Sequence, residues 1–110
     1  MAIPHAQSGE LIDVRPFGDS LPEHTTRALV KTDHLEIIRM VLPAGKEIQE
    51  HQAPREIIVQ CIEGRIEFTC HGQTQTLEPG RMLYLDPGQS HSLRAAEDSS
   101  MLLTLLLQPK

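Results

Sequence analysis

The sequence predicts an all-β domain in which short antiparallel strands close into a barrel or pack as a sandwich. Apolar and polar residues alternate with a period of two in several segments, as in strands with one buried and one exposed face. Turn residues separate these segments at even intervals, and no convincing amphipathic helix lies between them. Because 110 residues suit one compact domain, we expect a single domain over residues 1–110. Residues 1–10 are expected to form a flexible or dimer-exchanged arm.

The clearest strand covers residues 65–70, where Ile66, Phe68 and Cys70 alternate with polar neighbours. His71-Gly72 then predicts a tight turn, because glycine tolerates positive φ and histidine is moderately enriched there. The return strand is expected around residues 73–77.

Turn residues set the limits of the other strands, as at Pro79-Gly80 and Pro87-Gly88. The segment 35–42 does not alternate cleanly, and the segment 101–107 is apolar on both faces except for Thr104, which indicates that each is covered twice. Since a small domain has little core of its own, we expect a partner subunit as the second cover, and therefore a homodimer. The other strands are predicted at residues 11–15, 27–31, 35–42, 57–62, 82–85, 91–94 and 101–107.

Charge and composition exclude several classes of function. The formal net charge is −5 and the basic residues are scattered, so nucleic acid is not an expected partner. No apolar run is long enough to cross a membrane, and the N-terminus lacks the pattern of a signal peptide, so we expect a cytoplasmic protein. Cys61 and Cys70 are expected to be reduced thiols in the core. No catalytic-triad context, phosphate-binding glycine loop or HExxH motif supports a hydrolase, nucleotide-binding or zinc-protease function.

A first group of residues resembles the first motif of the cupin family, which runs from a glycine through His-x-His and a glutamate to a second glycine. Gly45 is followed after five residues by His51, and Gly64 stands thirteen residues beyond His51, as in the family. Ala53 takes the place of the second histidine and Ile57 the place of the glutamate. The resemblance therefore retains the spacing of the motif but only one of its metal ligands.

A second group resembles the second cupin motif, from Gly80 to His91. Gly88 and His91 fit the pattern, while Asp86 stands at the proline position and Pro87 follows one place later. The resemblance covers roughly residues 35–107 and is strongest to small single-domain bacterial cupins, most of which have no assigned activity. It implies a double-stranded β-helix, the RmlC-like jelly-roll barrel.

In metal-bearing cupins three histidines and one glutamate bind a divalent ion, typically iron, manganese, zinc, nickel or copper. His51 and His91 are the candidate ligands that the resemblance leaves in this chain. On a strand around residues 49–53, Gln49 and His51 share a face, and Glu47 would join them. Glu47, or Glu56 turned inward by a bulge, is the candidate third ligand.

The alternative is a metal-free cavity in which the two histidines are neutral and form hydrogen bonds, because two protein ligands rarely suffice for a metal. Tyr84 and Met82 would line the pocket if they face inward, although a half-buried strand tyrosine and a core-filling methionine are the commoner cases. Arg55 is either a partner for a carboxylate substrate or a surface residue beside Pro54.

Two functions stay open. The first is a binding protein that holds a small polar or anionic molecule in the barrel pocket, with no metal required. The second is a divalent-metal-dependent oxygenase, isomerase or lyase in which His51 and His91 bind the ion and Glu47 or Glu56 is third ligand or base. A structural dimer without a ligand would leave both histidines unexplained. The fold alone does not decide between these functions.

Overall fold

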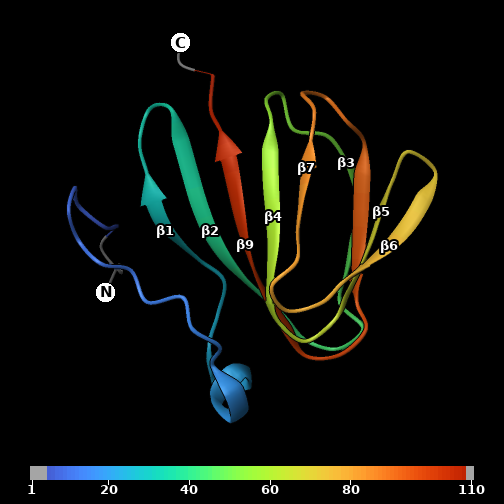
Figure 1. The fold of residues 1–110 in the computed structure, drawn as a ribbon, viewed down its shortest axis with the longest axis horizontal. Coiled ribbons are helices and arrows are strands. Elements are labelled where there is room, and N and C mark those ends of the chain that lie inside the picture. The colour runs from blue at the N-terminus through green and yellow to red at the C-terminus, as the bar shows by residue number, and fades with distance from the viewer. Residues whose placement is uncertain (1–4, 109–110) are drawn as a thin grey trace.

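Two antiparallel sheets face each other in the computed structural model, which describes residues 5–108 (Figure 1). The five-stranded sheet has the order β1-β2-β9-β4-β7 and the four-stranded sheet the order β3-β8-β5-β6. Strands distant in sequence are neighbours in both sheets, which confirms the predicted all-β jelly roll. The strands are β1 (Arg27–Lys31), β2 (Leu35–Leu42), β3 (Glu47–His51), β4 (Ile57–Glu63), β5 (Ile66–Cys70), β6 (Gln73–Leu77), β7 (Met82–Leu85), β8 (His91–Ala95) and β9 (Ser99–Leu106).

Most strands lie where the alternation of the sequence predicts them, but the strand expected at residues 11–15 is wrong. This segment pairs with no strand, Leu11 is fully exposed, and the Arg15 amide donates instead to the Asp13 side chain at 3.0 Å. Alternation indicates a strand only where a neighbour is available to pair with it. A short 3-10 helix, η1 (Gly18–Glu23), which the sequence did not indicate, follows the segment.

The core lies between the sheets and is mostly aliphatic. Phe68 is its one buried phenyl ring among the described residues, and Leu42, Val59, Ile66 and Met101 are at most 2% exposed. As predicted, Cys61 and Cys70 are buried free thiols. Burial raises the pKa of Cys61 to about 11, so its thiol stays protonated at neutral pH.

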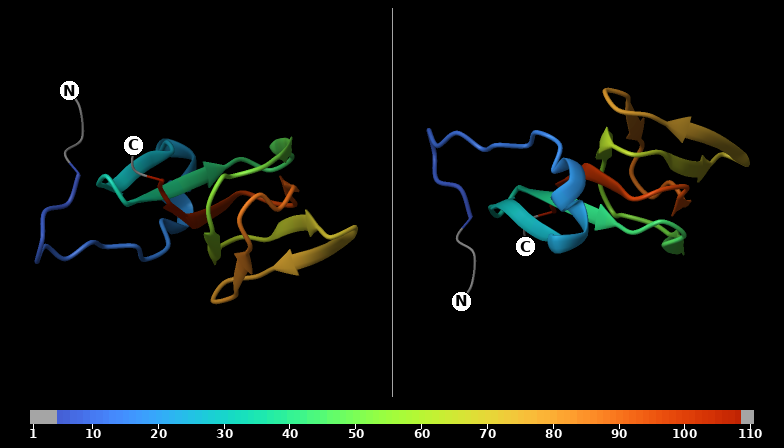
Figure 2. Two further views of the ribbon diagram at one scale, coloured as in Figure 1. Left: turned by 90° about the horizontal axis from the view of Figure 1, so that it is seen from above. Right: turned by 90° about the horizontal axis from the view of Figure 1, so that it is seen from below.

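The N-terminal segment runs beside β1 and then reaches η1 at one end of the barrel (Figures 1 and 2). Residues 1–4 of the expected arm lie outside the described residues. The Ala6 amide donates to the Leu29 carbonyl of β1 at 2.9 Å, and exchange of the arm between subunits stays a prediction. No helix within residues 5–108 is long and apolar enough to span a membrane.

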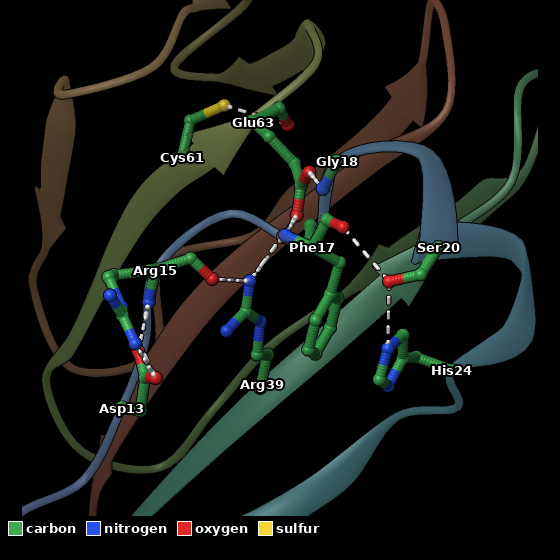
Figure 3. Close-up of polar contacts among 10 residues, drawn as sticks. Asp13, Arg15, Phe17, Gly18, Ser20, His24, Arg39, Cys61 and Glu63 are labelled. Carbon is green, nitrogen blue, oxygen red and sulfur yellow. Dashed lines mark hydrogen bonds and ion pairs between the residues drawn. The ribbon is translucent and has the colours of Figure 1, made fainter.

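One buried ion pair fastens this segment to the five-stranded sheet. Glu63 accepts hydrogen bonds from the Phe17 amide at 2.9 Å and the Gly18 amide at 3.0 Å, and it pairs with Arg39 Nη2 at 3.3 Å (Figure 3). The Arg39 guanidinium lies 3.7 Å above the Phe17 ring, and His24 stacks on the same ring at 3.6 Å. Residues 15–17 therefore cover the outer face of the sheet at Arg39.

Candidate functional site

His51 and His91 lie side by side at one end of the barrel. They face each other across strands β3 and β8, where they are directly paired, and their ring centroids are 4.2 Å apart. The register shifts between Ile48 and His51, so a bulge interrupts β3 there. Because a bulge changes which face the following residues occupy, both Ile48 and His51 approach the interior. The structure thus brings together the two histidines on which the sequence analysis depends.

Backbone carbonyls orient both imidazole rings in the same way. Nδ1 of His51 lies 2.9 Å from the Gln49 carbonyl oxygen, and Nδ1 of His91 lies 3.0 Å from the Gln89 carbonyl oxygen. A carbonyl oxygen can only accept, so each Nδ1 carries a proton and donates it. In the neutral rings each Nε2 then has a free lone pair. The two Nε2 atoms are therefore oriented to accept hydrogen bonds or to coordinate an electrophilic atom.

His91 is also held in its neutral form by its surroundings. Its side chain packs parallel to the Phe68 ring at 5.5 Å, and the residue is only 5% exposed. Burial, followed by the proximity of His51, lowers the pKa of His91, while the hydrogen bond to Gln89 raises it in part. At neutral pH the His91 ring therefore accepts hydrogen bonds at Nε2.

A cavity of about 300 Å³ opens beside the histidine pair. Apolar side chains from β9 and the β3–β4 loop form most of its wall, including Leu103, Leu105 and Pro54. A smaller cavity of about 40 Å³ shares both histidines and Leu103 with it and reaches Phe68 and Met101 in the core. The histidines thus supply polar atoms in a largely apolar space.

The acidic residue expected beside His51 lies elsewhere. Glu47 and Gln49 line a separate depression on the four-stranded sheet, together with Arg94, whose Nε lies 3.9 Å from the Glu47 carboxylate. The predicted shared face of Glu47, Gln49 and His51 is wrong, because the bulge before His51 shifts the alternation by one residue.

Glu56, Tyr84 and Met82 do not line the histidine cavity either. The Glu56 carboxylate pairs with Nε of its neighbour Arg55 at 3.3 Å, so the Arg55 charge already has a partner within the chain. Met82 and Tyr84 are 60% and 57% exposed on the outer face of edge strand β7, and the Tyr84 hydroxyl donates to Asp86 at 3.0 Å. They would line the pocket only if they faced inward, and this condition is not met, because Leu83 and Leu85 occupy the inner face of the strand.

The described donors do not fit a resident cupin metal. Within residues 5–108, no three His, Cys, Asp or Glu side chains converge in a group that could bind an ion. Protein sites for transition metals usually supply three or four ligands, and the pair at His51 and His91 supplies two.

Sequence reasoning missed the C-terminal wall of the cavity. Leu103, Leu105, Leu107 and Gln108 contribute to it, although the segment 101–107 was expected only to be covered on both faces. The period of two in β9 was the available signal, because it places Leu103 and Leu105 on one face.

The sequence of residues 38–107 matches the family described as Cupin domain. The chain belongs to the cupin family. This membership accounts for the two motifs around His51 and His91 and for the jelly roll of two antiparallel sheets, as in RmlC-like cupins. No curated protein matches the sequence.

Solved cupin structures agree with this fold. A cupin superfamily protein from Desulfitobacterium hafniense has 18% identity and a TM-score of 0.77, with 94% of this chain and 100% of that chain covered. A conserved protein of unknown function from Streptococcus pyogenes has 25% identity and a TM-score of 0.74 over 100% of this cupin and 97% of that chain. A DMSP lyase from Ruegeria pomeroyi has 24% identity and a TM-score of 0.67, covering 86% of this chain and 52% of its own. These likenesses support the fold and leave the ligand open.

Proposed function

We propose that this cupin binds a small molecule with a polar group on an apolar body in the cavity beside His51 and His91, without a resident metal. The observation that carries the proposal is the pair of imidazoles whose Nδ1 atoms are bound to carbonyls, at the wall of an apolar cavity. Ligand sites generally combine an apolar lining with a few oriented polar groups. The cavity volume of about 300 Å³ favours a small ligand.

The electrostatics favour a ligand that donates a hydrogen bond, such as a hydroxyl or amide. Nε2 of neutral His91 offers a lone pair, and none of the described residues that line the cavity has a carboxylate or cationic side chain. The apolar part of the ligand would then pack on the leucines of β9.

Replacing His91 with Phe is expected to weaken binding of such ligands by about threefold to tenfold, because one buried hydrogen bond is lost and the ring shape is largely kept. Saturation-transfer NMR with a library of small hydroxyl- and amide-bearing aromatic and aliphatic compounds would identify binders and rank them against the variant. His34→Ala is a matched control, since His34 is an exposed turn residue outside the cavity. Binders equally affected by both variants, or no binders at all, would contradict the proposed site.

The metal content of the purified protein decides between this proposal and a metal-dependent enzyme. Elemental analysis of untagged protein, prepared without chelator, is expected to find well under one transition metal ion per chain. The double variant His51→Ala, His91→Ala is expected to give the same low value. Near-stoichiometric metal that is lost in the double variant would overturn the metal-free proposal.

We also propose that a second copy of the chain covers the outer face of the five-stranded sheet. One row of paired residues crosses all five strands of this face, and its members are apolar or uncharged. Ile58 and Tyr84 in this row are 36% and 57% exposed. An uncharged, mostly apolar row across an open sheet is typical of an association surface. The row consists of Val30, Ile37, Thr104, Ile58 and Tyr84.

The substitution Ile58→Lys is expected to convert the dimer into a monomer, because it places a charge in the middle of this apolar row. Size-exclusion chromatography with light scattering measures the change in mass. The control Thr76→Lys places the same charge on exposed β6 of the other sheet and is expected to leave the dimer intact. A wild-type protein that is monomeric at high concentration would refute the homodimer.

A further inference from the structure

A second depression lies where the N-terminal segment crosses the five-stranded sheet. Its volume is about 410 Å³, and it shares no lining residue with the histidine cavity. Three arginines dominate its wall, two from the sheet and one from the N-terminal segment. The lining residues are Asp13, Arg15, Pro16, Phe17, Arg27 and Arg39.

The two sheet arginines form an unfavourable pair. Arg27 of β1 and Arg39 of β2 are directly opposite each other in the strand register. Like charges in this position destabilise a sheet unless a counter-charge lies near both. Arg27 makes no ion pair with any carboxylate of residues 5–108. Its charge is therefore left uncompensated on this wall.

Both nearby carboxylates are already engaged. Asp13 accepts three side-chain hydrogen bonds from Arg15, from Nε to Oδ1 at 3.0 Å and to Oδ2 at 3.2 Å, and from Nη2 to Oδ2 at 2.8 Å. Glu63 pairs with Arg39 from the opposite side and also accepts the Phe17 amide. One positive charge thus remains in excess around the depression, although the whole chain has a formal charge of −5.

Arg39 has unused donors although it is only 2% exposed. The hydrogen bonds that described residues accept from its guanidinium all come from Nη2, and buried Nε has no partner. Figure 3 shows the other terminal nitrogen pointing away from Glu63, toward Arg15 and Asp13. A buried guanidinium with open donors favours an anionic acceptor, because such hydrogen bonds are charge-assisted.

We propose that this depression binds a small oxyanion, a phosphate or carboxylate group, between Arg27, Arg39 and Arg15. The anion would lie between the paired sheet arginines and remove their repulsion. It would also connect the N-terminal segment, through Arg15, to strands β1 and β2. The site is separate from the histidine cavity, so it does not depend on the function proposed there.

Isothermal titration calorimetry of the full chain with inorganic phosphate, and separately with acetate, tests the proposal at constant ionic strength set by sodium chloride. We expect one saturable site. Arg27→Gln is expected to weaken it at least about tenfold, since it removes a charge-assisted hydrogen bond. Comparison of phosphate with acetate identifies which oxyanion group the site prefers.

The control variant is Arg81→Gln, which removes the same charge from an exposed position outside this depression. It is expected to leave the affinity unchanged within about twofold, because Arg81 does not line the depression and its exposed charge is screened by salt. Arg27 is also exposed, so its variant is expected to fold, and circular dichroism checks this. Absence of saturable heat with both anions, or an equal loss in Arg27→Gln and Arg81→Gln, would overturn the proposal.

Discussion

Replacing Glu63 with alanine is expected to lower the free energy of unfolding by about 3–5 kcal/mol, because it leaves the buried Arg39 charge without its partner. The Arg39 and Glu63 side chains are 3% and 14% exposed, and their closest nitrogen and oxygen are 3.3 Å apart. The substitution also removes the acceptor for Ser100 Oγ, now 2.6 Å away, and for two amides of the N-terminal segment. Urea unfolding followed by circular dichroism measures the loss.

Two further variants distinguish the effect of breaking the Arg39–Glu63 ion pair from the effect of removing any one negative charge. Glu78→Ala removes an exposed carboxylate without an ion-pair partner among the described residues and is expected to change stability by less than about 0.5 kcal/mol. The double variant Arg39→Met, Glu63→Leu is expected to be more stable than Glu63→Ala, because it leaves no unpaired buried charge. A loss below about 1 kcal/mol in Glu63→Ala would show that water replaces the carboxylate freely.

The same carboxylate is expected to contribute to the acid sensitivity of the fold. Burial alone would raise the pKa of Glu63, but hydrogen bonds from Ser100, Phe17 and Gly18 and the charge of Arg39 together lower it below its ordinary value of 4.5. A lowered pKa in the folded state stabilises the protein above pH 4.5, and this stabilisation is lost as the pH falls through the folded-state value. Glu63→Gln should therefore flatten the dependence of unfolding free energy on pH in the acid range.

The sequence predicted elements whose signals are local and missed those that depend on pairing. The alternation in residues 66–70 and the turn at His71-Gly72 were readable, and His71 has φ of +52°. Alternation at residues 11–15 was equally readable but misleading, because no strand is available beside that segment. Local pattern fixes the faces of a strand, whereas pairing depends on residues far along the chain.

The candidate site, too, has parts that the sequence predicted and parts that depend on how the strands pair. Motif spacing brought His51 and His91 together correctly, because the two motifs lie on paired strands. The bulge after Ile48 leaves no clear mark in the sequence, and it moved Glu47 and Gln49 to the other face. Arg39, a charged residue in the middle of the mostly apolar strand Leu35–Leu42, was an available signal for a buried ion pair. Its partner Glu63 could not be identified from the spacing of residues in the sequence.

Replacing Gly64 with alanine is expected to destabilise the protein by about 3 kcal/mol or more, among the largest effects of any single substitution. Gly64 has φ of +85°, which costs a residue with a side chain roughly 1–2 kcal/mol. A methyl group there would also overlap Ser99 Oγ and the Asp98 carbonyl oxygen and lie 2.7 Å from Ser99 Cα. Two of these three contacts are backbone atoms, so the strain cannot be relieved by turning one side chain.

A variant of Gly45, the first glycine of the same motif, separates the cost of the positive φ from the cost of the steric overlap. It has the same φ of +85° but no atom within 4 Å of the added methyl group, so Gly45→Ala is expected to cost only about 1–2 kcal/mol. The difference between the two variants in urea unfolding then measures the close approach of the β4–β5 turn to the start of β9. Equal losses would mean that backbone conformation alone selects glycine at position 64. A larger loss in Gly64→Ala would mean that this glycine is needed for the contact between the two chain segments, which places Arg65 N within 3.0 Å of Ser99 Oγ.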